Sequence, residues 1–425
     1  MDKFVINGGN KLFGEVTISG AKNSALPIIA GTVLVKDRCI IDNVPDIKDV
    51  DVIIEILRML GADVKYEKDG VLDIDCTNLD KTSATEPIVR KMRASYYLLG
   101  VLLGRFHTAD VALPGGCDFG GRPIDQHVKG FEALGAEIKI EHGIVSAKAE
   151  DGLWGENIYL DVVSVGATIN IMLGAVLAEG LTVIDNAAKE PHVVDLANFL
   201  NSMGANIKGA GTDTIKIKGV PELHGGAYTI IPDQIEAGTF MVAAAACGGD
   251  VLIKNVIPKH LEAITAKLEE MKIGIEEYDD SVRVFRDNTP IHKANIKTLP
   301  YPGFPTDMQP LAVMLLSVAQ GTSIVREDVW ENRFQYVDQL TALGANIKVN
   351  GNSVVIEGVP GLSGCPVRST DLRAGAAMLI AGLIAKGTTE LYNLTHIDRG
   401  YEKFQSKLSA LGADITRVNN VEDEI

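Results

Sequence analysis

Two kinds of helical pattern alternate with short strand-like runs along this chain. One kind is amphipathic, as at Val337 to Leu343, and it ends in Leu-Gly-Ala or a close variant before a strand-like run. Glycine after the last helical turn is the expected stop, because it tolerates the left-handed conformation. The pattern recurs about every 70 residues and predicts a repeat architecture. Its six copies are Leu60-Gly61-Ala62, Leu134-Gly135-Ala136, Met203-Gly204-Ala205, the degenerate Met271-Lys272-Ile273, Leu343-Gly344-Ala345 and Leu411-Gly412-Ala413.

The other kind of helix is apolar almost all round and rich in Gly and Ala. A helix of this kind is buried on every side. Each repeat therefore contributes one buried helix, one half-exposed helix and short strands, which predicts an α/β protein with helices inside and sheets outside. An ordinary βαβ array with its helices outside is the alternative. The all-apolar segments are Ser24 to Val35, Ala94 to Leu103, Gly166 to Leu177, Met308 to Ala319 and Ala374 to Ala385.

The repeats divide into two sets of three. Three repeats end near Val220 to Ile231, where glycines and Pro232 favour a domain boundary. We predict a first domain over residues 22–231. The second domain comprises residues 1–21 and 232–425, because by count the strand-like segment Lys3 to Ile18 completes the other set. We expect the active site in the cleft between the two domains.

Charge and cysteine usage narrow the function. The formal net charge of −16 argues against binding of nucleic acid or of an anionic membrane, although a local Arg and Lys cluster could still hold a small anion. Five scattered cysteines indicate reduced thiols, and Met1 to Lys11 shows no signal peptide. The apolar runs are too short to span a bilayer. We expect a cytoplasmic protein. Because the histidines and cysteines show no zinc-type spacing, we expect neither metal nor cofactor.

The glycine-rich segment Leu113 to Pro123 is the most unusual stretch. Four glycines and two prolines surround Cys117 and Arg122, a composition typical of a mobile lid. Arg122 favours a thiolate and Asp118 opposes it. Cys117 is thus a candidate nucleophile or general acid, and an incidental cysteine in a flexible turn is the alternative. The segment is neither a Walker loop nor a G-x-G-x-x-G motif.

Five cations stand at predicted helix starts: Lys22, Arg93, Arg333, Arg373 and Arg399. Any one of them alone is explained by a surface ion pair. Together the five cations suggest helix N-termini that point at a polyanion. Asn23 and Ser24, which follow Lys22, are both good N-caps. Arg373 in a first helical turn faces the positive end of the helix dipole, at a cost that an anion at the helix start would reverse.

Two polar positions beside apolar helices are further candidates. Asp307 precedes the helix at Met308, where it is either an N-cap or a general base. Ser164, Val165 and Gly166 form a cap with an open first turn, which suits backbone contact with a diphosphate.

These residues resemble the UDP-N-acetylglucosamine branch of the enolpyruvyl transferase family over the full length of the chain. The resemblance implies a two-domain inside-out α/β barrel with six βαβαββ-like repeats. It also implies transfer of the enolpyruvyl group of phosphoenolpyruvate to the sugar 3′-hydroxyl, the first committed step of peptidoglycan synthesis, with inactivation by fosfomycin. The motifs are Lys22-Asn23, Pro114 to Cys117, Arg122 to Asp125, Pro305 to Gln309, Glu331 to Phe334, Asp371 to Arg373 and His396 to Tyr401.

The resemblance implies a role for each candidate residue. Cys117 is the general acid that protonates C3 of phosphoenolpyruvate, and Asp307 takes the proton from the sugar hydroxyl. Lys22, Arg122 and Arg399 hold the phosphate, whereas Arg333 and Arg373 hold the carboxylate side. The remaining contacts implied are Asn23 and Arg93 in the cleft, and Arg122, Pro123, Ile124, Asp125, Gln126, His127, Ser164, Val165, Gly166 and Val329 on the UDP-sugar.

Three alternative functions compete with the one that the resemblance implies. The sister enolpyruvyl transferase of the shikimate pathway shares the fold, but has no comparable cysteine in that loop. A non-catalytic paralogue that binds the UDP-sugar and regulates the pathway would not need Lys22, Cys117, Asp307 and Arg399 intact. A cysteine hydrolase would need a base for Cys117, and His127 is the only nearby histidine. The partners implied by the resemblance are the small molecules phosphoenolpyruvate and UDP-N-acetylglucosamine.

Overall fold

A computed structural model describes residues 2–67, 70–113 and 124–419 of the 425-residue chain, and these residues form six four-stranded sheets. All six sheets share one order. A first strand runs parallel to the second, the second pairs antiparallel with the third, and the third pairs antiparallel with the fourth. Buried and exposed residues alternate along the strands, as in β19 (Thr322–Arg326), so one face of such a sheet is solvated.

The described residues divide into two compact units, Gly20–Ile231 and Met1–Ser19 with Pro232–Ile425, here called the first and second unit. Near the two ends of the first unit, the Ala21 amide donates to the Ile231 carbonyl at 2.8 Å. Each unit contains three sheets. Those of the first unit are β14 (Gly226–Thr229), β3 (Arg38–Asp42), β5 (Val71–Asp75), β4 (Asp63–Glu67); β6 (Ser83–Ala84), β7 (Thr108–Ala112), β9 (Ile144–Lys148), β8 (Glu137–Glu141); and β10 (Asn157–Tyr159), β11 (Leu181–Asp185), β13 (Thr214–Lys218), β12 (Asn206–Lys208).

The N-terminal strands belong to sheets of the second unit. Strand β1 (Lys3–Asn7) lies between β23 (Thr388–Tyr392) and β24 (Asp414–Val418), and β2 (Leu12–Thr17) runs parallel to β15 (Gly249–Lys254). The sheets of this unit are β2, β15 (Gly249–Lys254), β17 (Ser281–Arg286), β16 (Gly274–Glu277); β18 (Ile296–Lys297), β19, β21 (Ser353–Glu357), β20 (Asn346–Asn350); and β22 (Pro366–Arg368), β23 (Thr388–Tyr392), β1, β24 (Asp414–Val418).

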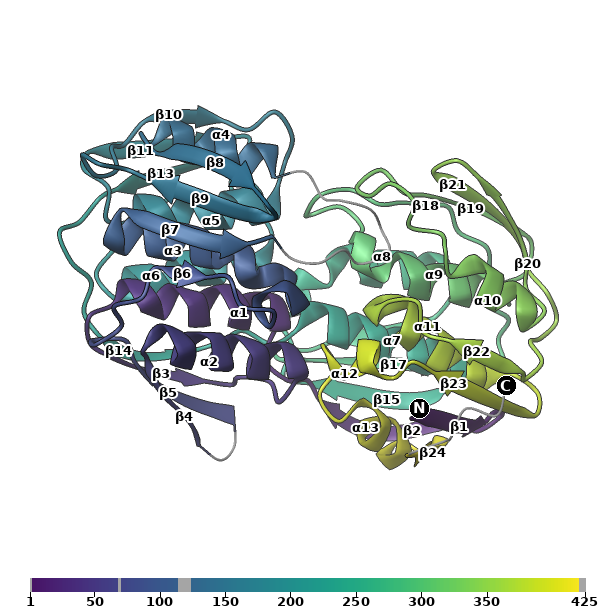
Figure 1. Cartoon of the computed structure of the whole chain (residues 1–425). Coiled ribbons are helices and arrows are strands. Elements are labelled where there is room, and N and C mark those ends of the chain that lie inside the picture. Colours follow the sequence, from purple (N-terminus) through teal and green to yellow (C-terminus); the bar gives the residue numbers. More distant parts are fainter. Residues whose placement is uncertain (1, 68–69, 114–123, 420–425) are drawn as a thin grey trace. The chain divides into compact units, whose positions relative to one another are not determined.

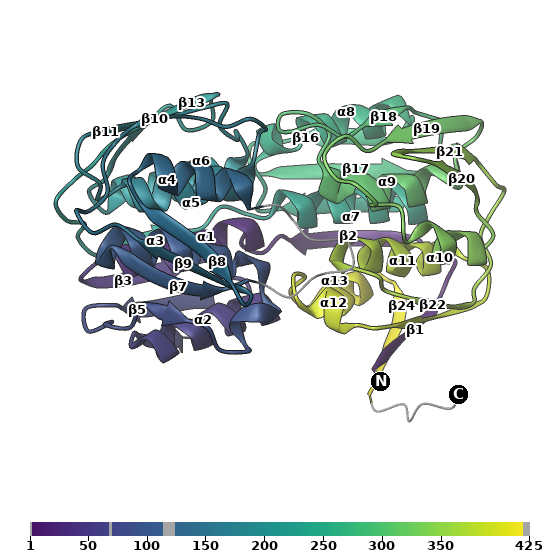
Figure 2. The same cartoon turned by 45° about the horizontal axis from the view of Figure 1, so that its top comes forward.

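Each unit packs three apolar helices inside its sheets. The three helices of a unit lie side by side in both views (Figures 1 and 2). In α9 (Gln309–Leu316) every residue is buried, and the predicted arrangement of inner helices and outer sheets is confirmed. The alternative with helices outside is wrong. None of the described helices has the length and apolar character needed to cross a membrane. The inner helices are α1 (Lys22–Gly31), α3 (Tyr97–Phe106), α5 (Val165–Ala175), α7 (Gln234–Cys247), α9 (Gln309–Leu316) and α11 (Leu372–Ile384).

The amphipathic helices end as their Leu-Gly-Ala motifs predict. The five motif glycines have φ between 93° and 109°, and Lys272 of the degenerate copy adopts the same left-handed conformation with φ 67°. These helices are α2 (Lys48–Leu60), α4 (Asp125–Ala133), α6 (Pro191–Ser202), α8 (Glu262–Glu270), α10 (Val337–Ala342) and α13 (Phe404–Ala410).

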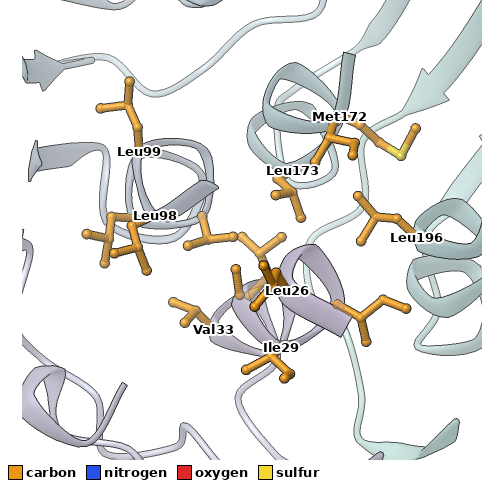
Figure 3. Packing of buried hydrophobic residues seen from close by; sticks show 14 of the residues in the cluster. Leu26, Ile29, Val33, Leu98, Leu99, Met172, Leu173 and Leu196 are labelled. Carbon is orange, nitrogen blue, oxygen red and sulfur yellow. The ribbon is translucent and has the colours of Figure 1, made fainter. Parts of the chain in front are cut away.

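The core of the first unit is built on close contact between its inner helices. Figure 3 shows Leu26, Leu98 and Leu173, from α1, α3 and α5, among the side chains that fill it. Where α3 meets α5, the Gly100 amide donates to Asn170 Oδ1 at 2.9 Å. A Cβ atom on Gly100 would lie 2.4 Å from Asn170 Oδ1 and 2.5 Å from its carbonyl oxygen. Glycine is therefore required here for the two backbones to approach.

We predict that Gly100→Ala destabilises the protein by roughly 1–3 kcal/mol, because the added methyl overpacks the contact by more than alanine gains in helix propensity. Chemical denaturation followed by circular dichroism measures the change. Gly361→Ala is the matched control, since a Cβ there meets nothing within 4 Å. Equal stability of the two variants would contradict the close contact between α3 and α5.

Candidate active site

The carboxylate of Asp307 binds two arginines within the second unit. Asp307 lies in the short helix η6 (Thr306–Met308) before α9. Its Oδ1 accepts from Arg333 Nη2 at 2.9 Å, and its Oδ2 accepts from Arg373 Nε at 3.1 Å. The two arginine side chains are 8% and 4% exposed, and that of Asp307 is 30% exposed. The interpretation of Asp307 as an N-cap is wrong, because the carboxylate turns to the guanidinium groups and caps neither helix.

The electrostatics of this cluster favour full ionisation. Burial raises the pKa of the Asp307 carboxyl, but the charges and hydrogen bonds of Arg373 and Arg333 outweigh burial and hold the pKa far below its usual range. Burial lowers the pKa of Arg373, and Tyr401, Asp307 and Asp233 together raise it above the usual value. The Arg373 guanidinium also lies over the Tyr401 ring, 5.2 Å from its centroid. In this arrangement Asp307 is a very weak base.

Both arginines retain unused donors. Arg333 Nε and Arg373 Nη1 are buried and have no hydrogen-bond acceptor among the described residues. A buried guanidinium N–H without an acceptor is costly, and such donors match the geometry of carboxylate and phosphate oxygens. The cluster is thus suited to bind an anion in addition to Asp307.

Glu327 connects the segments around this cluster. Its side chain accepts from Thr298 Oγ1 at 2.7 Å, from Thr306 Oγ1 at 2.9 Å and from the amides of Val329 and Trp330 at 2.9 and 3.1 Å. Arg333 Nη1 in turn donates to Thr306 Oγ1 at 2.8 Å. The predicted contact residue Val329, which is 36% exposed, is held in this way beside the segment of Asp307.

The start of α11 differs from expectation in one respect. Arg373 was expected to face the helix dipole unfavourably unless an anion lies there. Asp371 supplies that anion, because it is the N-cap and accepts from the amides of Arg373 and Ala374 at 2.9 and 3.1 Å. Arg399 is half-buried and follows the short helix α12 (Thr395–Asp398), so it stands at a helix end and not at a helix start.

Lys22 forms a buried ion pair within the first unit. Its Nζ lies 2.7 Å from Asp49 Oδ2, and the two side chains are 12% and 5% exposed. Helix α1 begins at Lys22, so the expectation that Asn23 caps it is wrong. The Ala21 carbonyl already accepts the amides that follow, which places Asn23 in the first turn.

A second group of predicted residues meets between α4 and α5. Gln126 Nε2 donates to Asp161 Oδ2 at 3.1 Å, and Gln126 Oε1 accepts from the Asp161 amide at 2.8 Å. Ser164 caps α5 by accepting from the Ala167 amide at 3.3 Å. A Cβ on Gly166 would lie 3.2 Å from His127 Nε2. The structure thus brings the α4 start, Ile124, Asp125, Gln126 and His127, close to the α5 start, Ser164, Val165 and Gly166.

His127 is buried and neutral. Burial lowers its pKa to about 4. Its Nδ1 lies 3.0 Å from Asn170 Nδ2, and its ring centroid lies 5.6 Å from that of Tyr96. Asn170 Oδ1 accepts from Gly100, so its amide nitrogen is the donor to His127 Nδ1. The proton of the neutral ring therefore resides on Nε2, which faces Gly166.

The remaining predicted site residues are Arg93 and three residues of the glycine-rich segment. Cys117, Arg122 and Pro123 lie outside the described residues. Arg93 begins the short helix η4 (Arg93–Tyr96) and is half-buried. In the described part of the chain no group of three or more His, Cys, Asp or Glu side chains has an arrangement that could hold a metal ion. The sequence patterns assigned no role to Asp49, Asn170, Glu327 and Tyr401, because partners such as Lys22 for Asp49 and Thr298 for Glu327 are remote along the chain.

A family model described as EPSP synthase (3-phosphoshikimate 1-carboxyvinyltransferase) matches residues 6–408. The chain belongs to the EPSP synthase family. A relative from Clostridium botulinum named UDP-N-acetylglucosamine 1-carboxyvinyltransferase is 60% identical over 98% of this chain and 100% of its own length. UDP-N-acetylglucosamine 1-carboxyvinyltransferase 2 of Bacillus subtilis is 52% identical over 100% of this chain and 99% of its own length.

Solved structures of an enolpyruvyl transferase and of an EPSP synthase share this fold. The enolpyruvyl transferase NikO from Streptomyces tendae superposes with a TM-score of 0.89 at 28% identity, over 98% of both chains. An EPSP synthase from Acinetobacter baumannii gives a TM-score of 0.76 at 20% identity, over 99% of this chain and 100% of that one. The predicted fold class, an inside-out α/β barrel pair of six repeats, is confirmed.

For this EPSP synthase family member we predict that His127 adds a pH dependence to stability. Its folded pKa of about 4 lies below the ordinary value of 6.5, so the unfolded state binds the proton first. Stability is lost as the pH falls from 6.5 toward 4, by at most about 1.4 kcal/mol per pH unit. Denaturation midpoints at pH 7 and pH 5 measure this loss, which His127→Gln should reduce. The exposed His142→Gln is the control, and an equal loss in wild type and His127→Gln would refute the prediction.

Proposed function

We propose that this chain transfers the enolpyruvyl group of phosphoenolpyruvate to the 3′-hydroxyl of UDP-N-acetylglucosamine and releases phosphate. The observation that carries the proposal is 60% identity to a UDP-N-acetylglucosamine 1-carboxyvinyltransferase over nearly the whole of both chains. The reaction is the first committed step of peptidoglycan synthesis. The free thiols of Cys39, Cys76, Cys247 and Cys365 support a reducing compartment, and we place the reaction in the cytoplasm.

The proposed chemistry is an addition followed by an elimination. Cys117 donates a proton to C3 of phosphoenolpyruvate while the sugar oxygen bonds to C2 and loses its proton to Asp307. Loss of a C3 proton and of phosphate from the tetrahedral adduct then restores the double bond as an enol ether. Lys22, Arg122 and Arg399 would neutralise the phosphate, and Arg333 and Arg373 the carboxylate.

The ion pairs of Asp307 add a requirement to this scheme. A carboxylate held by Arg333 and Arg373 accepts a proton poorly. The unused donors of the same two arginines support binding of an anionic substrate there. Such a substrate would compete with Asp307 for the guanidinium charge, raise the pKa of Asp307 and so make it a better base once both substrates are bound.

Two further features of the structure support the other predicted substrate contacts. The joined starts of α4 and α5 suit a UDP-sugar, because neutral His127 and the open turn at Gly166 offer donors at close range. The buried Lys22–Asp49 pair keeps an ammonium group in a fixed place. The full set proposed for the substrates is Lys22, Asn23, Arg93, Arg122, Pro123, Ile124, Asp125, Gln126, His127, Ser164, Val165, Gly166, Asp307, Val329, Arg333, Arg373 and Arg399.

Phosphate release tests the function directly. We expect release only when phosphoenolpyruvate and UDP-N-acetylglucosamine are both present, with a product heavier by one enolpyruvyl group in mass spectrometry. The family description favours shikimate 3-phosphate as the competing acceptor, so it is assayed in parallel. Release with shikimate 3-phosphate alone would assign the chain to that activity. Binding of the UDP-sugar without release would indicate a regulatory paralogue.

The role of Cys117 is tested by Cys117→Ser. A serine hydroxyl is a far weaker acid than a thiol, so we expect turnover to be nearly abolished while UDP-N-acetylglucosamine still binds in isothermal titration calorimetry. Cys365→Ser is the control, because that free cysteine has no role in the proposed chemistry. Ordinary turnover in Cys117→Ser would exclude it as the acid.

Substitution by aspartate separates acidity from nucleophilicity at the same position. An aspartic acid can donate a proton but resists alkylation. We therefore expect Cys117→Asp to retain turnover and to survive incubation with fosfomycin at concentrations that inactivate the wild type. Equal inactivation of both proteins would show that fosfomycin reacts elsewhere.

A further inference from the structure

Glu327 is a buried carboxylate held only by neutral donors among the described residues. The residue is 2% exposed, and its four hydrogen bonds come from two threonine hydroxyls and two backbone amides. Burial of a carboxylate is costly unless its oxygens are satisfied. Four donors meet that requirement, and they come from three separate stretches of chain.

Two of the three stretches lead to the proposed active site. Thr306 immediately precedes Asp307, while Val329 and Arg333 lie on the segment that follows Glu327. Thr298 joins the network twice, because it donates to Glu327 and its Oγ1 accepts from the Asp328 amide at 3.0 Å. Removal of the carboxylate would therefore loosen all three stretches at once.

One hydroxyl connects the carboxylate to the ionic cluster. Thr306 Oγ1 donates to Glu327 and accepts from Arg333 Nη1, and Arg333 Nη2 donates to Asp307. Because the Thr306 hydroxyl donates its proton to Glu327, the lone pairs of Thr306 Oγ1 are directed toward Arg333. The orientation of the guanidinium fork thus depends on Glu327 through a single atom.

We propose that Glu327 is a positioning residue for the reaction, which sets the Arg333 fork on Asp307 and holds the Val329 segment without touching the substrates. The proposal rests on the proposed function. Glutamine at this position would keep the size of the side chain but replace one acceptor oxygen by an N–H donor. Either the Thr306 hydroxyl alone, or the Thr298 hydroxyl together with the two backbone amides, would then lose its acceptor.

The test is Glu327→Gln in the full chain, assayed by phosphate release. Displacement of the Arg333 fork should lower kcat roughly 10- to 100-fold, and displacement of the Val329 segment should raise KM for UDP-N-acetylglucosamine. Arg333 and Arg373 are the charged groups that face Asp307, and Asp233 and Tyr401 act on Arg373. With Arg333 loosened, the acid limb of the kcat profile, which reports the pKa of Asp307 in the substrate-bound enzyme, should move to higher pH.

Asp328→Asn is the matched control. It makes the same carboxylate-to-amide change at the next residue, where the side chain pairs with Lys297 and Arg326 outside the network. We expect wild-type kcat and an unshifted acid limb. A second variant, Thr306→Val, removes the connecting hydroxyl while it leaves the carboxylate in place. Its loss of kcat should add little to that of Glu327→Gln in the double variant, because both act through Arg333.

The outcomes separate this inference from the function itself. If the wild-type protein releases no phosphate, the proposed function is wrong, and the positioning role proposed for Glu327 is wrong with it. Active wild type with a Glu327→Gln variant that shows a lower Tm, but unchanged kcat and an unchanged acid limb, would make Glu327 a purely structural residue. Fully additive effects of Glu327→Gln and Thr306→Val would also overturn the proposed connection.

Discussion

The close packing of three apolar helices inside each unit is the constraint on which this structure depends. Because sheets cover the helices from outside, polar side chains gather at the helix starts. In the second unit Asp307, just before α9, reaches Arg373 in the first turn of α11. In the first unit the start of α5 at Gly166 approaches His127 of α4. The candidate site is thus a consequence of the same packing that makes glycine necessary at Gly100.

Burial also determines the charge balance at Asp307. Two guanidinium groups that are almost fully buried would be unfavourable without an anion, and Asp307 supplies one. The same pairing suppresses the basicity that the proposed reaction needs. The stability of the unliganded cluster and its catalytic use therefore oppose each other. Under the proposed function, an anionic substrate that uses the free donors of the two arginines and competes with Asp307 for their charge would relieve this conflict. Perturbed carboxylates of this kind are typical of active sites.

The periodicity of the sequence predicted most of the fold, because each repeat is marked by local hydrophobic patterns and helix-terminating residues. The left-handed stop at the end of each amphipathic helix depends on residues within one turn, and even Lys272 follows it. Helix starts were predicted less well. Asn23 is not a cap, since the Ala21 carbonyl takes that place, and Arg373 is balanced by Asp371. The resemblance supplied the candidate residues. Their partners, such as Asp49 for Lys22, depend on contacts between distant segments, which no local pattern records.

Buried carboxylates illustrate that limit, because each one holds chain segments that are remote in sequence. Asp195 accepts from the Tyr228 hydroxyl at 2.6 Å and from the Ile231 amide at 3.4 Å, beside the point where the chain leaves the first unit. Glu236 accepts from the Ser19 amide at 2.8 Å, and burial raises its pKa to about 7 despite the charge of Lys407. Glu327 likewise accepts hydrogen bonds from separate chain segments around Asp307. A hydrophobic residue at any of these positions would cost less to bury, but it could not hold backbone amides, and that capacity gives the acidic residue a physical reason to be there.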